Sequence, residues 1–548
     1  MEEAWQHTVV ERKQDMLIDI VSPFSEKVEY RRDGKVLETM ILFVPGECAG
    51  NTVREEFSNH GCSERLKELI RDMDTEITVL FTDAANRIRV FRSITSHYEL
   101  YYMVRAGEIM ISDHIRNLLC RIPVPERRVD LAGVCDTFLF QHNYGLHTTI
   151  RGITRLGAGE YLCFESGRLT VELLQKIRIG AYDLRGADGT EVLENTLKNA
   201  VETMQREDSI NTLSGGVDSA LTELYIQGNK SVSACYAFEG FLHEREYALN
   251  AAELLHTEHE VYMIPMEEYM DRLRLAIQGF GMSTYNMTAQ IMHYTLGREV
   301  KESHMFLSEI AGAVYGLGMR KPLTDELRLA VPMEHAHNYA NMYGEIARLD
   351  DVAYLKRMFG NDIVEESLGR RNKYVLERLE GFDTADVSVE NYLQLAHLSF
   401  YFTNNATAAD EQTEMIFGKT LNTPYSDRKL LESFLSLPLK ERYHNAVYGE
   451  KPYAKMLLEK RLPGYEVNKQ KLGGSLPRTW MITEGPMRNY FHKHDIPEFI
   501  PQSMREELYH PGWDNSWGVK YAIMHSMWLE NVMQLQLEAH ALRWRLEV

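Results

Sequence analysis

The chain has 548 residues, 44% of them hydrophobic, and a formal net charge of −20. This length allows two or more domains with large buried cores. The negative charge argues against a broad surface for nucleic acid or for an anionic membrane, so neither is expected as a partner. No apolar run reaches about 18 residues, and no secretion signal opens the sequence, so we expect a cytoplasmic globular protein.

The predicted elements change character along the chain. Up to about residue 175 the sequence is strand-rich, which favours a sandwich of two sheets. From about Glu191 helices and strands alternate, with strands at 208–213, 231–238 and 260–264, and this alternation predicts a doubly wound parallel sheet. Beyond about residue 322 helical stretches dominate. The fold class is therefore α/β combined with α+β.

The most informative stretch connects the strand at 208–213 to a helix at 220–226. Its residues are Leu213, Ser214, Gly215, Gly216, Val217, Asp218 and Ser219. Unpaired N–H groups at a helix start favour a phosphate, and the glycines let the backbone approach it closely. Asp218 would repel a bare phosphate, so its presence predicts a bridging Mg²⁺. The sequence therefore predicts a cradle for the phosphates of ATP.

Other phosphate loops fit this stretch less well. It lacks the lysine of G-x-x-x-x-G-K-[ST] and the spacing of G-x-G-x-x-G. The run SGGVDS instead resembles the loop of the ATP pyrophosphatases, which cleave ATP between its α and β phosphates. The alternative is a serine-glycine turn with an incidental acid.

Further motifs resemble the asparagine-synthetase family, and the resemblance spans most of residues 75–480. They share the family's order along the chain and are Tyr101-Tyr102, Ile111-Ser112-Asp113, Thr149-Ile150-Arg151-Gly152, Glu244-Arg245-Glu246-Tyr247, Thr423-Pro424-Tyr425-Ser426-Asp427, Glu450-Lys451-Pro452-Tyr453 and Asn468-Lys469-Gln470-Lys471-Leu472-Gly473. The resemblance implies an inactive glutamine-amidotransferase-like domain at 1–185, a degenerate Ntn-amidohydrolase-like β-sandwich. It implies an ATP-pyrophosphatase synthetase domain at 190–548 with a helical C-terminal part.

The resemblance also implies roles for individual residues. Lys471 matches the lysine that stabilises the adenylation and amide-forming transition states, and Lys451 resembles a second lysine near the phosphates. Phe238 and Ser308 fall at nucleotide-binding positions. Glu309 is predicted to be the base that takes a proton from the attacking amine. The alternatives are solvated lysines and a structural acid at a helix start.

Two departures from the family shape the functional prediction. Members that hydrolyse glutamine use a cysteine as first residue, whereas this sequence begins Met1-Glu2-Glu3 and its first cysteine is Cys48. We therefore expect the amine to come from the substrate. The usual S-G-x-G-x-D-E segment is also altered after Ser308, so the second metal-binding acid is missing and Asp218 is the predicted metal ligand.

These observations predict an ATP-dependent, AMP-forming ligase that joins a carboxylate to an amine. Macrolactam closure of a peptide, as in lasso-peptide cyclases, is the favoured form, with a peptide or a small amino-acid-derived substrate and a precursor-peptide maturation partner. The alternatives are a β-lactam-synthetase-like enzyme, an ammonia-using asparagine synthetase, and a non-catalytic homologue.

Several other signals receive structural interpretations. Asp427 is predicted to cap the helix that begins near Lys429. The aromatic cluster of Trp513, Trp517, Tyr521 and Trp528 is predicted to pack a terminal helix. The histidines at 492 and 494 are interpreted as solvated or core side chains, because no thiol or carboxylate set of zinc-site type accompanies them.

Overall fold

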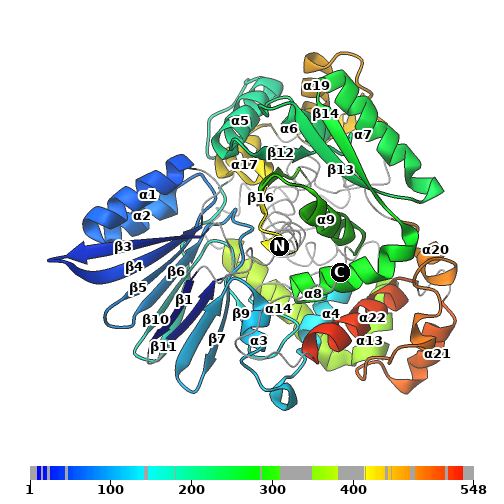
Figure 1. The fold of residues 1–548 in the computed structure, drawn as a ribbon, viewed down its shortest axis with the longest axis horizontal. Helices are drawn as coiled ribbons and strands as arrows, with labels where there is room; N and C mark the ends of the chain where they lie inside the picture. The colour runs from blue at the N-terminus through cyan, green and yellow to red at the C-terminus, as the bar shows by residue number, and fades with distance from the viewer. Residues whose placement is uncertain are drawn as a thin grey trace.

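The structure is a computed structural model that describes most of the chain. The described residues are 9–13, 16–20, 25–43, 47–140, 143, 146–178, 180–283, 287–308, 349–379, 413, 415–438, 442, 444–445, 447–469, 476–511 and 516–534. Figure 1 shows a sheet-rich part at the left, a second sheet with its helices at the top, and a helical part at the lower right.

Two sheets make up the N-terminal part. The first has the strand order β1-β2-β8-β7-β9, and the second has the order β11-β10-β6-β5-β4-β3. The strands of the first sheet are β1 Val9–Lys13, β2 Met16–Ile20, β7 Tyr101–Arg105, β8 Glu108–Ser112 and β9 Thr154–Arg155. Those of the second are β3 Glu26–Arg32, β4 Lys35–Phe43, β5 Thr78–Asp83, β6 Ile88–Arg92, β10 Glu160–Glu165 and β11 Arg168–Leu173.

An apolar core lies between these two sheets. Ile18 and Ile111 of the first sheet pack with Leu80 and Val90 of the second, and all four are buried. The opposite face of the second sheet is covered by α1 (Glu47–His60) and α2 (Glu64–Asp72). The strand-rich, layered pattern predicted up to about residue 175 is confirmed.

The first sheet packs its other face against helices. These are α3 (Ile115–Leu119) and α4 (Leu131–Phe140), and their core continues into the later part of the chain. The two parts of the protein are thus joined by one continuous apolar core.

The second half of the chain contains a five-stranded sheet with the order β14-β13-β12-β15-β16, in which every neighbouring pair is parallel. Its strands are β12 Ser209–Thr212, β13 Lys230–Tyr236, β14 Glu258–Ile264, β15 His304–Phe306 and β16 Thr420–Asn422. Successive residues point to opposite faces: Met305 joins the core on one face and Phe306 the core on the other.

Helices cover both faces of this sheet. One face packs against α5 (Gly189–Met204), α6 (Val217–Glu223), α7 (Leu242–Leu255), α17 (Arg428–Phe434) and α19 (Pro452–Arg461). The other packs against α8 (Tyr269–Phe280) and α9 (Met287–Glu299). The mixed α/β class and the parallel sheet agree with the prediction.

Beyond residue 322 the described elements are mainly helical, as predicted, with two exceptions. Besides α17 and α19, the described α-helices of this region are α13 Leu349–Phe359, α14 Asn361–Leu379, α20 Arg478–Thr483, α21 Arg505–Tyr509 and α22 Ser516–Trp528. The first exception is β16, the fifth strand of the parallel sheet. The sequence did not predict it, because three residues are too few to show an alternating pattern. A short hairpin of β17 (His444–Asn445) and β18 (Gly449–Glu450) is a second exception.

The predicted aromatic helix is confirmed as α22. Trp517, Tyr521 and Trp528 lie on it and are buried. Trp513 lies outside the described residues.

The two parts of the chain are also held together by a buried arginine. The Arg428 guanidinium donates to the carbonyl oxygens of Arg71 (3.2 Å), Met73 (3.4 Å) and Lys176 (3.4 Å). It also pairs with Glu432, with 3.0 Å between Nε and the carboxylate. Arg428 is the first residue of α17, so this contact fixes that helix on the N-terminal part.

Candidate nucleotide site

The glycine loop follows β12, at the point where the order in which the chain adds strands to the sheet reverses. The chain passes from β12 to β13 on one side and later returns to β15 on the other, so β12 and β15 flank a topological switch point. Ligands of open α/β sheets bind outside the carboxyl ends of the strands at this point. The run from Leu213 to Ser219 occupies this edge, where its sequence predicted a nucleotide.

Gly215 has a left-handed backbone and no room for a side chain. Its φ is +71°, and an added Cβ would lie 2.3 Å from the carbonyl carbon and oxygen of Tyr247 on α7. The loop therefore passes directly over the α7 backbone, which only glycine permits.

Hydroxyl groups hold the loop against the start of α6. The Ser214 hydroxyl lies 3.2 Å from that of Ser219, and the Ser214 N–H donates to the Ser219 hydroxyl over the same distance. Below them Asn211 donates to the Ser219 carbonyl (3.1 Å) and to the Glu223 carboxylate (2.8 Å). These bonds fix the loop on the strand and the helix before any ligand binds.

Asp218 faces a lysine from a distant part of the chain. Its Oδ2 accepts a hydrogen bond from Lys451 Nζ at 2.5 Å, and 19% of the Asp218 side chain is exposed. Its Oδ1 is buried and has no hydrogen-bond partner among the residues that the structure describes. A buried carboxylate oxygen without a partner is costly, and a cation would stabilise it. The structure thus brings together Asp218 and Lys451, two of the residues singled out in the sequence.

The backbone of Lys451 is itself unusual. It is left-handed, with φ +58° and ψ +47°, and it immediately precedes α19. This conformation costs a non-glycine residue about 1–2 kcal/mol. The strained turn carries the ammonium group that reaches the glycine loop.

Two tyrosines that the sequence analysis did not single out as site residues fasten the loop from behind. Tyr465 donates to the Gly215 carbonyl (2.5 Å), and Tyr425 donates to the Asp218 carbonyl (2.7 Å). Burial raises the pKa of both phenols, so both stay protonated and act as donors.

A further lysine lies beside the loop. Lys469 Nζ is 4.2 Å from the centre of the Tyr465 ring and 4.9 Å from that of Tyr247. Both rings belong to residues that touch Gly215, and each attracts the ammonium group. Lys469 therefore adds a second positive charge to this edge of the sheet.

Ser308 and Phe238, the other described residues predicted to bind the nucleotide, follow other strands of the sheet. Ser308 follows β15 and is buried, and its hydroxyl lies 2.9 Å from that of Thr222 on α6. Phe238 follows β13 and packs against Trp480 of α20, with ring centres 4.3 Å apart and the rings tilted by 36°. Glu309 and Lys471 lie outside the described residues.

Asp218 is the described side chain best suited to hold Mg²⁺. Among the described residues no group of three or more His, Cys, Asp or Glu side chains could form a metal site by itself. Mg²⁺ is often bound by one or two carboxylates together with substrate phosphates. The unpartnered Oδ1 of Asp218 fits that manner of binding.

The predicted role of Asp427 as a helix cap is confirmed. Its carboxylate accepts from the Leu430 N–H at 2.9 Å at the start of α17. Burial is the main reason that its pKa is raised to about 7, and the hydrogen bond from Leu430 opposes the rise.

This raised pKa predicts how stability changes with pH. The folded state keeps the Asp427 proton up to about pH 7, whereas an unfolded aspartic acid loses it near pH 3.9. Asp427 therefore contributes stability below about pH 4, which is lost as the pH rises to about 7, with a slope of at most about 1.4 kcal/mol per pH unit. Asp427→Asn keeps the cap and should remove this slope.

Urea unfolding of both proteins at pH 5 and pH 8 measures the difference. We expect the stability of the unsubstituted protein relative to Asp427→Asn to fall between the two pH values. An equal change in both proteins would contradict the raised pKa.

The fold and the loop together define a class of protein. A doubly wound parallel sheet with a glycine-serine loop, an acid and two lysines at its switch point is typical of a nucleotide-binding α/β domain. The family model described as asparagine synthase matches residues 192–537, and the chain belongs to this family. Its members are ATP-dependent ligases that form carbon–nitrogen bonds. A search of curated proteins finds no match.

None of the described helices is both long enough and apolar enough to cross a bilayer.

Proposed function

We propose that this protein is an AMP-forming amide synthetase that closes a macrolactam in a peptide. The observation that carries the proposal is the ion pair between Asp218, beside the glycine loop at the sheet's switch point, and Lys451, which reaches it from the start of α19. Family membership supports ATP-dependent amide synthesis in general. We also propose that residues 190–548 form an ATP-pyrophosphatase domain and that residues 1–185 form a degenerate amidohydrolase-like domain.

In the first step an oxygen of the substrate carboxylate attacks the α phosphorus of ATP. The bond between that phosphorus and the bridging oxygen breaks, and pyrophosphate leaves. The loop N–H groups and the hydroxyls of Ser214 and Ser219 lie where the leaving phosphates would be bound. Lys451, Lys469 and Lys471 would supply positive charge, and Mg²⁺ held by Asp218 would neutralise charge on the phosphates.

In the second step the amine attacks the acyl carbon and AMP leaves. The attacking nitrogen must lose a proton, and Glu309 is the proposed base. Phe238 and Ser308 complete the proposed nucleotide-binding set.

The state of the cysteines supports an amine carried by the substrate. The described thiols of Cys62, Cys120, Cys135 and Cys163 are buried or half-buried, and burial raises the pKa of each. A thiol in this state is a weak nucleophile, because the thiolate is the reactive form. These four thiols are therefore poor candidates for a nucleophile that would release ammonia from glutamine, which is consistent with an intramolecular amine.

Pyrophosphate release with a panel of peptides that contain both an acid and an amine tests the proposal. We expect ATP turnover with at least one peptide, release of AMP, and loss of one water mass from the peptide. Lys471→Ala should lower the rate about 10²-fold or more, by analogy with the loss of a single transition-state donor. Lys460→Ala, an exposed change on α19, is the matched control and should keep full activity.

Other results of this assay would identify one of the alternative functions. Turnover with free aspartate and ammonia alone would indicate an asparagine synthetase, and turnover with a small β-amino acid would indicate a β-lactam-type enzyme. Absence of both ATP turnover and Mg-ATP binding would indicate a non-catalytic homologue.

A further inference from the structure

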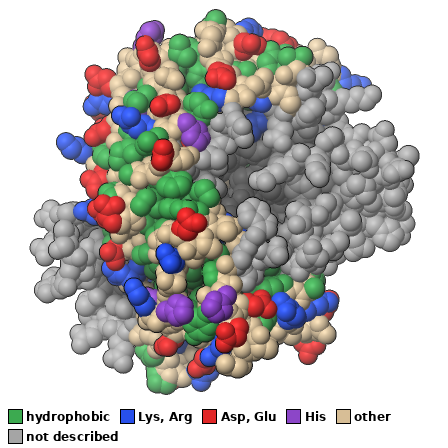
Figure 2. Space-filling model, turned by 90° about the vertical axis from the view of Figure 1, so that its right-hand side faces the viewer, with side chains coloured by type: hydrophobic (Ala, Val, Ile, Leu, Met, Phe, Trp, Pro, Cys, Tyr) green, Lys and Arg blue, Asp and Glu red, His purple; other side chains and the backbone are tan. Residues whose placement is uncertain are grey.

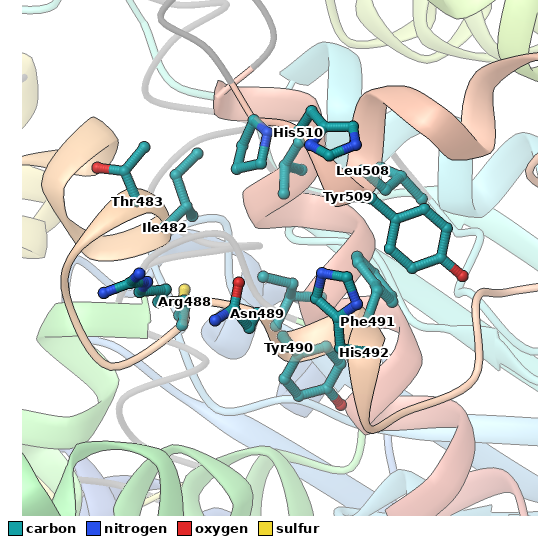
Figure 3. A pocket seen from close by; sticks show the side chains of 14 residues that line it. Ile482, Thr483, Arg488, Asn489, Tyr490, Phe491, His492, Leu508, Tyr509 and His510 are labelled. Carbon is teal, nitrogen blue, oxygen red and sulfur yellow. The ribbon is translucent and has the colours of Figure 1, made fainter.

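A groove lies in the helical part of the chain, separate from the glycine loop. Its floor consists of buried apolar side chains from α20, α21, α22 and the segment that follows α20, among them Ile482, Met487, Leu508 and Ile523. The cavity over this floor has a volume of about 340 Å³. This is the size of a small-ligand site, for which about 300–1,000 Å³ is usual. Figure 3 shows the labelled side chains arranged around it.

The rim of the groove is polar, and among the described residues its side chains make no hydrogen bonds or ion pairs. Arg488, Asn489, His492 and His510 line it and are exposed. Within the described part of the chain, none of these four side chains takes part in a hydrogen bond or an ion pair. The rim therefore offers donors and acceptors that the fold itself does not use.

The groove is elongated. A second hollow of about 400 Å³ adjoins the first and shares Phe491, His492, Tyr509 and His510 with it, and Glu506 is its additional lining residue. The rings of His492 and Tyr509 lie 5.1 Å apart between the two hollows. Figure 2 shows histidine side chains beside hydrophobic ones on the lower part of this face. An open groove of this shape suits an extended chain better than a compact metabolite.

The chemistry of the rim indicates which kind of extended chain the groove would bind. An asparagine amide can pair with both the N–H and the C=O of a peptide backbone, as Asn489 could here. Arg488 carries a fixed positive charge and binds carboxylates well, and the histidines beside it add further donors. Among the described lining residues no acid borders the first hollow, and Glu506 is the one acid that borders the second. These lining residues favour a peptide segment in which an apolar side chain packs on the floor and a neighbouring acidic side chain pairs with Arg488.

The groove is connected to the nucleotide site by a single short helix. α20 carries Ile482, which lies on the floor of the groove, and Trp480, whose ring contacts that of Phe238. A chain bound in the groove would thus lie one helix away from the proposed site of ATP.

We propose that this groove binds an extended, acidic segment of the peptide substrate and holds it while its reacting ends lie in the synthetase site. The inference rests on the proposed function for the identity of the peptide as substrate. Binding itself requires neither ATP nor turnover.

Affinity selection tests the groove directly. The probe is a pool of randomised octapeptides, acetylated and amidated at their ends, incubated with the full chain without ATP and read by mass spectrometry. We expect enriched peptides to pair an apolar residue with Asp or Glu. Arg488→Ala/Asn489→Ala should weaken their binding about tenfold or more, since two interactions with the peptide are lost. Lys493→Ala, which changes an exposed neighbour outside the groove, should leave binding within about twofold.

Three results would overturn the inference. These are absence of any enriched peptide, equal binding by the double variant, or self-association of the unsubstituted chain that the double variant loses, which would mean that a second copy of the chain occupies the groove. Failure of the proposed function would look different: peptides would bind at the groove with no pyrophosphate released. With a turned-over peptide, the double variant should raise KM and leave kcat unchanged.

Discussion

Gly215→Ala is expected to abolish ATP turnover, with a loss of about 10²-fold or more in the rate of pyrophosphate release. The new Cβ would lie 2.3 Å from backbone atoms of Tyr247, and backbone cannot move aside as a flexible side chain can. The loop must then leave α7, and its bond from Tyr465 to the Gly215 carbonyl breaks. Isothermal titration with Mg-ATP and the pyrophosphate assay measure the two consequences.

A matched control separates the collision from the backbone conformation. Gly167 has nearly the same φ, +75°, and an added Cβ there would meet nothing within 4 Å. Gly167→Ala should therefore cost only the left-handed strain, about 1–2 kcal/mol of stability, and leave ATP binding intact. Retention of ATP binding by Gly215→Ala would show that the loop is not the phosphate site.

Asp218→Asn is the second change with a large expected effect. It keeps the size of the side chain and removes the charge that pairs with Lys451 and that would hold Mg²⁺. We expect kcat/KM for ATP to fall about 10²-fold or more and its dependence on Mg²⁺ concentration to weaken. Steady-state pyrophosphate release across a magnesium series measures both.

Two comparisons sharpen this test. Asp208→Asn alters an acid directly before β12, at the end of that strand away from the glycine loop, where it contacts His304, and should leave turnover unchanged. Lys451→Met in the Asp218→Asn background should cost less than it does alone, because the two side chains interact directly. Activity of Asp218→Asn within a few fold of normal would remove the acid from the mechanism.

The sequence predicted the parts of this site that are local. The flanks of Leu213 to Ser219 indicated a strand, a loop and a helix, and β12 and α6 lie there. The helix predicted at 220–226 begins earlier, at Val217, so Asp218 lies in the first turn of α6 and not in the loop before it. These elements could be predicted because strand, turn and helix preferences act over a few residues.

Contacts between distant segments could not be predicted in this way. Tyr465 reaches the loop from 250 residues away and Tyr425 from 207. Both depend on where α19 and α17 pack, which no local pattern specifies. β16 escaped prediction for the same reason, because its three residues become a strand only through pairing with β15.

The position of Arg428 carries a consequence for how this gene can be rearranged. Three of its guanidinium contacts are carbonyl oxygens of residues 71, 73 and 176, whereas Tyr425, three residues earlier, holds the Asp218 carbonyl. Splitting the gene into two polypeptides near residue 185 would leave that guanidinium without these three carbonyl acceptors, in a segment that also fastens the glycine loop. The separated halves would be expected either to reassociate or to lose the loop, so the N-terminal part is indispensable even in the absence of any chemistry of its own.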